Sequence, residues 1–312
     1  MDPTQPLSVT INLNSFLDTV KITATDGAQI GGGAQHKQVY LWTLFFKIDG
    51  DTVSVNASLN LEGNATVVPT SGNHGDLGRT DQFTDNEAGV KISIPAHLGQ
   101  FRTILQPIPL KVPIAGINSV PGNVGCVVVL LADGGLPDDA VAKGHDAFDS
   151  TFHSQLDQII PTLGPAKKEP SPDDIKSMTQ AISDAVESAI QGNVNFWHKI
   201  FALLFDRDQP IDQALLKFSG DDLAKAPATG LPIRNLFTTG GAGQATDPDG
   251  KPVAEVSVTE FYELNGSVFC HQTDAALSRF LQSQRMVASP GIKALMLPRF
   301  SSVRSWMASA VW

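Results

Sequence analysis

Acidic side chains gather in two segments of the sequence, and metal binding is the first chemistry that they suggest. Asp49 and Asp51 follow a strongly apolar run, whereas Asp76, Asp81 and Asp85 lie in a polar stretch, residues 70–89, that has no periodicity. Carboxylate oxygens in a long loop suit Ca²⁺, and loops of this length are commonly functional or mobile. These five aspartates are therefore candidate ligands of a calcium site, but ordinary solvated loops explain the same residues more simply.

Imidazole groups give a second candidate site. His145, Asp149 and His153 are spaced four apart in a segment with helical periodicity. Either histidine can share a metal ion with Asp149, but the two histidines lie ~12 Å apart along the helix axis and cannot both reach one ion. His145 also falls within the apolar stripe of the helix. We therefore expect a core histidine with a satisfied hydrogen bond, next to a surface Asp–His pair.

Local catalytic motifs are missing from the sequence. It has no Gly-x-Ser-x-Gly elbow, no His-Glu-x-x-His pattern and no Cys-x-x-Cys pair. The glycine runs at 31–33 and 240–243 do not lead into predicted helices, so phosphate-loop chemistry is unsupported. A hydrolase whose site is assembled from distant residues leaves no such trace and stays open as an alternative.

Two apolar strands and one long helix must position these groups. Residues 124–131 contain no charged or amide side chain, and residues 39–48 are apolar on both alternating faces except at Thr43 and Lys47. Strands of this kind are typical of sheets that are covered on both sides. The helix beginning near Pro137 carries an apolar stripe, so we expect it to cover one sheet face.

The remaining periodicity predicts a mainly β chain with inserted helices, an α+β fold. We expect strands over 7–13 and 18–25, a two-residue turn at Asp49-Gly50 and a hairpin turn at Asn265-Gly266. Helices are expected over 137–161, 171–190 and 195–206. The predicted architecture is an antiparallel β-sandwich over residues 1–274, in which a three-helix layer, inserted at about 137–218, packs on one sheet face.

Three short segments read Phe-Phe-Lys-Ile-Asp-Gly-Asp at 45–51, Gly-Asn-His-Gly-Asp-Leu-Gly at 72–78, and Ile-Pro with Leu-Gly-Gln-Phe at 94–101. In this order they resemble segments of a group of uncharacterised bacterial proteins. The resemblance covers residues 7–271 and implies no activity, cofactor or partner. The basic and partly apolar tail, residues 275–312, lies outside it.

Composition limits the partners. The net charge of −10 disfavours nucleic-acid binding, which needs many cations to neutralise phosphates. The N-terminus has no basic and apolar leader, and no apolar run approaches the length of a spanning helix, so we expect a cytoplasmic protein. Cys126 and Cys270 lie in apolar runs and are expected to be free thiols, with a disulfide as the alternative. The apolar run Phe196–Phe205 favours core packing over membrane contact.

The sequence predicts a class of function but no ligand or substrate. We expect a non-enzymatic binding or assembly module that self-associates through the 275–312 tail or the helical layer. The first alternative is a calcium-dependent surface or membrane binder, comparable in fold to C2 domains and acting through the acidic loops. The second alternative is the hydrolase with a dispersed site.

Overall fold

The computed structural model describes residues 1–24, 39–70, 91–132, 137–162, 184, 209–246 and 252–273. Contacts divide the chain into two units, Met1–Asp274 and Ala275–Trp312, and the second lies outside the described residues. The described strands are β1 Leu7–Ala24, β2 Val39–Ile48, β3 Val53–Val55, β4 Leu61–Gly63, β5 Thr66–Pro69, β6 Lys91–Ser93, β7 Gln100–Leu105, β8 Ile108–Ile114, β9 Ile117–Val120, β10 Asn123–Ala132, β11 Gln209–Ser219, β12 Leu231–Thr246 and β13 Pro252–Gln272. The described helices are α1 Ala96–Gly99, α2 Asp138–Ile159, η2 Ile160–Thr162 and α5 Gly220–Lys225.

The prediction of a mainly β chain with a helical component is confirmed. The described strands form one sheet in the order β12-β13-β1-β6, with β7 also paired to β1, and a second in the order β11-β10-β2-β5. A third, smaller sheet has the order β4-β3-β8-β9. Neighbouring strands are antiparallel except β3 and β8, which pair in parallel. The fold is therefore a β-rich α+β fold.

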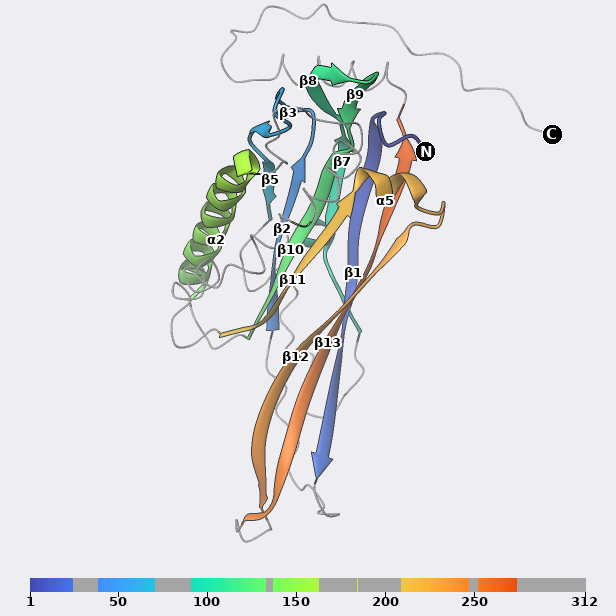
Figure 1. Ribbon diagram of the computed structural model, residues 1–312. Helices are drawn as coiled ribbons and strands as arrows, with labels where there is room; N and C mark the ends of the chain where they lie inside the picture. The colour runs from blue at the N-terminus through green and yellow to red at the C-terminus, as the bar shows by residue number, and fades with distance from the viewer. Residues whose placement is uncertain are drawn as a thin grey trace, which may run out of the picture. The chain divides into compact units, whose positions relative to one another are not determined.

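Strands β2 and β10 pair with each other in the interior of the second sheet (Figure 1). Every residue of both strands is buried, including the Lys47 and Asn123 side chains. A strand that is buried on both faces cannot alternate apolar with polar side chains, because neither face meets water. The prediction that these two runs are dry on both sides is confirmed.

Alternate residues of β2 contact different parts of the chain. Trp42 stacks on Phe148 of α2 with ring centroids 5.9 Å apart, and Phe46 contacts Phe152 one turn further along the helix at 5.6 Å. Phe45, which points to the opposite face of the strand, stacks on Phe101 of β7 at 5.1 Å. Strand β2 thus contacts a helix with one face and the first sheet with the other.

Helix α2 begins directly after Pro137, and Asp138 and Asp139 occupy its first turn, where carboxylates meet the positive end of the helix dipole. Its apolar stripe is fully buried, which confirms the predicted helix and its covered face. The stripe consists of Val141, Phe148, Phe152 and Leu156. The helices expected over 171–190 and 195–206, with Phe196–Phe205, lie outside the described residues, apart from the helical Asp184.

The predicted end of the helical insertion, at about residue 218, is wrong. Residues 209–219 form β11, which pairs with β10 along its length. The apolar residues of this segment fit both the helical and the strand period, so the sequence pattern alone does not distinguish a helix from a strand here. The insertion therefore ends before Gln209.

One predicted turn is also wrong, and the strand that follows the other has unexpected partners. Asn265-Gly266 lies inside the continuous strand β13, where Asn265 pairs with Arg234 of β12 and with Ser15 of β1. Asp49-Gly50 does turn the chain, but β3 then pairs with β4 and β8 rather than with β2. The segments 7–13 and 18–25 are one strand, β1, with a register shift between Leu13 and Ser15. Long-range strand partners decide all three outcomes.

Both cysteines are free thiols, as expected. Burial raises the pKa of Cys270 to about 11 and raises that of the fully buried Cys126 as well, so both thiols stay protonated at neutral pH. Among the described residues, no helix is long and apolar enough to cross a bilayer.

Candidate functional site

Asp49 and Asp51 lie beside a lysine at the end of β2. The Lys47 Nζ atom donates to Asp49 Oδ2 at 2.7 Å, to Ile104 O at 3.2 Å and to Asp51 Oδ2 in a closer contact. Asp49 is fully buried, the Lys47 side chain is 3% exposed and that of Asp51 is 23% exposed. We call these three residues the buried charge cluster.

Backbone groups fix the Asp49 carboxylate. Its Oδ2 atom accepts a hydrogen bond from the Gln106 N–H at 2.9 Å, and its Oδ1 atom accepts one from the Asp51 N–H at 3.2 Å. Burial raises the pKa of Asp49, and the Asp51 charge raises it further, while Lys47 and the Gln106 N–H oppose the shift. The cluster thus joins the end of β2 to the chain that follows β7.

The cluster bears directly on the predicted calcium site. Asp49 and Asp51 do come together, but a lysine ammonium occupies the position between their carboxylates. The other three predicted ligands, Asp76, Asp81 and Asp85, lie outside the described residues. Within the described part of the chain, no group of three or more metal-binding side chains is close enough to hold an ion. Calcium binding stays a prediction that a calorimetric Ca²⁺ titration can test.

The two histidines of α2 have different surroundings. His145 is 2% exposed, meets the edge of Trp42 at a centroid distance of 5.3 Å, and places Nδ1 3.4 Å from Asp149 Oδ2. The expected burial of His145 is therefore confirmed, whereas a fully satisfied imidazole is not, because its Nε2 atom has no hydrogen-bond partner among the described residues. Asp149 pairs with His145 and not with His153, so the predicted surface Asp149–His153 pair is wrong. Among the described residues, His145 Nε2 and Trp42 Nε1 have no hydrogen-bond partner.

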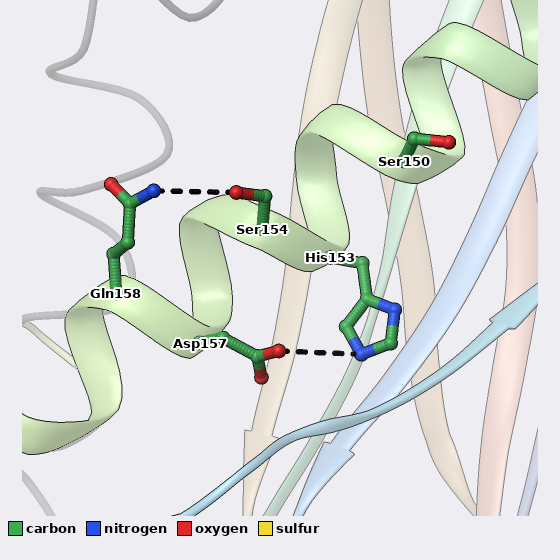
Figure 2. A pocket seen from close by; sticks show the side chains of 5 residues that line it. All are labelled: Ser150, His153, Ser154, Asp157 and Gln158. Carbon is green, nitrogen blue, oxygen red and sulfur yellow. Dashed lines mark hydrogen bonds and ion pairs between the residues drawn. The ribbon is translucent and has the colours of Figure 1, made fainter.

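The exposed side of α2 carries an open pocket, shown in Figure 2. It is lined by Ser150, His153, Ser154, Asp157 and Gln158. His153 Nε2 lies 3.6 Å from Asp157 Oδ2, and Gln158 Nε2 donates to Ser154 Oγ at 3.3 Å. A serine, a histidine and an aspartate on adjacent turns bring the hydrolase alternative to mind, so their geometry has to be compared with that of a catalytic triad.

The pocket does not have the geometry of an activated nucleophile. Ser150 Oγ donates to the Asp146 carbonyl of its own helix at 2.8 Å, and Ser154 Oγ accepts from Gln158. An activated serine instead donates to the imidazole that removes its proton. His153 and Asp157 also follow the i,i+4 spacing of ordinary surface pairs on helices. The pocket is therefore a polar helix surface, and it gives the hydrolase alternative no support.

A different feature was missed from the sequence. Strand β1 has β13 on one side along its whole length, but on the other side β7 pairs only with Leu7–Asn12 and β6 only with Ser15–Leu17. Residues 18–24 of β1, 237–246 of β12 and 252–262 of β13 pair only with one another among the described residues (Figure 1). We call these three segments the distal ribbon.

The distal ribbon presents two unpaired strand edges within the described part of the chain. One edge is residues 18–24 of β1, and the other is the glycine-containing segment of β12. A strand edge of this kind offers backbone N–H and C=O groups that can bind a further strand. The only sequence signal was the alternation at 18–25, which predicted the strand but could not show that its partners stop on one side.

No family model matches the sequence, and the comparison with curated proteins gives no match either. Function is therefore inferred from the residues and contacts of this chain.

Proposed function

We propose that the protein is a non-enzymatic assembly module in which the β1 edge of the distal ribbon pairs with the same edge of a second copy. One observation carries this proposal: residues 18–24 extend past β6 and β7 and have a described strand neighbour on one side only. Strand addition at such an edge takes its affinity from main-chain hydrogen bonds.

A second copy is the best-matched occupant of this edge. An antiparallel pair of identical strands is compatible with a two-fold axis, so the contact closes as a dimer and leaves no further β1 edge. The β12 edge is less suited, because Gly240, Gly241 and Gly243 weaken strand propensity and specify register poorly. Residues 18–24 instead contain four β-branched residues, which favour strands: Thr19, Val20, Ile22 and Thr23.

We infer that the scaffold behind the ribbon is the antiparallel β-sandwich expected from the sequence, with helix α2 as part of a layer on its outer side. The ring contacts of Phe45 with Phe101 on one face of β2, and of Trp42 with Phe148 on the other, support this arrangement. A core of this kind holds the first strand rigidly, so the ordering cost of pairing falls on the ribbon alone.

Size-exclusion chromatography with light scattering tests the proposal on the full chain. We expect a dimer whose population rises with concentration, and a Val20→Lys variant that is monomeric at the same concentration. A lysine on a strand edge opposes edge-to-edge pairing because two copies bring like charges together. Asn12→Lys is the matched control, because Asn12 is half-buried on the same strand but already has strand partners on both sides.

Salt separates this route from self-association through the basic tail, residues 275–312. Exposed charges more than about 10 Å apart are largely screened at 0.1 M salt, whereas backbone pairing persists. A dimer that survives 0.5 M salt and is lost in Val20→Lys supports the proposal. A monomer at every concentration, or a dimer that both lysine variants keep, would overturn it.

A further inference from the structure

The buried charge cluster brings three charged side chains together where little water can reach them. One ammonium group meets two carboxylates, and two of the three side chains are almost completely removed from water. Lys47 Nζ is also held by the Ile104 carbonyl at 3.2 Å, so three protein oxygens fix its position. This arrangement places an amine against the carboxyl of Asp51, with a second carboxyl beside both.

We propose that Lys47 and Asp51 join through an amide bond between Nζ and Cγ, and that Asp49 transfers the protons that this reaction requires. The bond would be formed by the folded chain itself, without a cofactor or a second protein. It would make residues 47–51 a closed ring at the end of β2.

Burial favours this reaction over a permanent ion pair. Removing an ammonium and a carboxylate from water is costly, and a buried pair recovers that cost only when its geometry and hydrogen bonds are excellent. A neutral amide carries no such penalty. Holding the two groups in contact also replaces a bimolecular encounter, an advantage that corresponds to effective concentrations of about 10⁵–10⁸ M in well-oriented systems.

The atoms and protons balance within the cluster. Asp49, as a carboxylate, accepts a proton from the Lys47 ammonium across the 2.7 Å hydrogen bond. The neutral amine attacks Cγ of Asp51, the Nζ–Cγ bond forms, and Asp49 returns its proton to one Oδ atom of Asp51. Asp49 then carries a second proton from Nζ to the same oxygen, the Cγ–O bond breaks, and this oxygen leaves as water with both protons, while nothing is oxidised or reduced. The raised pKa of Asp49 helps this carboxyl to hold the proton between the two steps.

The product fits the contacts already present. The amide nitrogen keeps one N–H, which can donate to the Ile104 carbonyl that now accepts from Nζ. Asp49 stays fixed by the Gln106 and Asp51 backbone N–H groups. The hydrogen bonds that fix Lys47 and Asp49 are therefore compatible with the product.

Intact-protein mass spectrometry tests the proposal directly. We expect the purified full chain to be lighter than its sequence mass by one water, and tryptic fragments to show no cleavage after Lys47 and to contain the Lys47–Asp51 link. Asp49→Asn keeps both bonding residues but cannot shuttle the proton, so we expect the full sequence mass. A wild-type protein with the full sequence mass would overturn the proposal.

Two controls separate this bond from other losses of water. Asp-Gly sequences such as Asp49-Gly50 can dehydrate to a succinimide, but that loss would persist in Lys47→Arg, which cannot form the amide. A deficit that Lys47→Arg retains would therefore refute the link. Lys111 and Glu62 form an equally close ion pair with side chains 56% and 44% exposed. We expect their peptides to be unmodified, and a link there would contradict the requirement for burial.

Discussion

The structure changes the role inferred for Asp49 from a metal ligand to a member of a buried ion pair. Its position after a strand and next to Asp51 favoured a metal ligand, because both side chains offer oxygens at one end of the sheet. The structure places Lys47 against both carboxylates and two backbone N–H groups on Asp49. The positive charge expected from a calcium ion is instead supplied by the ammonium group of Lys47.

The buried Asp49 gives stability a distinctive pH dependence. Because burial raises its pKa above the ordinary value of 3.8, the folded protein binds more protons than the unfolded chain between the two values. The contribution of Asp49 is therefore fully present below the unfolded pKa and is lost as pH rises through the folded pKa. We expect Asp49→Asn to remove this negative slope, which is at most about 1.4 kcal/mol per pH unit for one proton.

Urea denaturation at a series of pH values measures that slope. Asp2 is the matched control, because its carboxylate is exposed and its pKa is lowered by the hydrogen bonds from Thr4. Its contribution has the opposite sign: it is present above the unfolded pKa and is lost as pH falls. If Asp2→Asn and Asp49→Asn changed the pH profile in the same direction, the burial argument for Asp49 would fail.

Among the elements, β13 departs most from the sequence-based expectation. Asn265-Gly266 is a strong turn signal, yet it lies within a strand that pairs with β1 and β12 together. A Cβ atom on Gly266 would lie 2.4 Å from the Asn12 carbonyl oxygen and 3.1 Å from Leu13 Cα. Glycine is present there because the backbone of β1 approaches closely, at the point where the register shifts.

Gly266→Ala should therefore destabilise the first sheet. The obstructing atoms belong to the main chain of a paired strand and cannot rotate away, so we expect a loss of about 1–3 kcal/mol in the free energy of unfolding, measured in urea. Ser267→Ala, one position along the same half-buried stretch, should cost no more than about 0.5 kcal/mol. Equal effects of the two substitutions would show that the close approach is not what requires glycine.

These elements show what local pattern could predict and what it could not. The burial of β2, β10 and the apolar stripe of α2 could be predicted, because it follows from the apolar residues within each segment and from their spacing. The path of the chain after Asp49-Gly50, and the pairing of β1 with β13, depend on residues far away in sequence, which no local pattern contains. The cluster around Lys47 was missed for the same reason, since Ile104 of β7 and Gln106, which follows that strand, complete it from a distant part of the sequence.

At the scale of the whole molecule, the proposed dimer should change the hydrogen exchange of one segment, residues 18–24. Amide groups of residues 18–24 that point away from β13 have no described backbone partner in one copy. We expect their hydrogen exchange to slow as the protein concentration rises, while exchange in Leu7–Asn12, already paired on both sides, stays constant. Exchange that does not depend on concentration in either segment would contradict edge-to-edge pairing.

The register of the first sheet also has a consequence for how the protein is made. Leu7 pairs with Gln272 and Ala24 with Val256, so β1 depends on a strand that is synthesised much later. At synthesis rates of about 5–20 residues per second, β1 waits on the order of ten to fifty seconds for β13. During that time its apolar residues are without their final partner, and unpaired strands with exposed apolar surface are prone to aggregate.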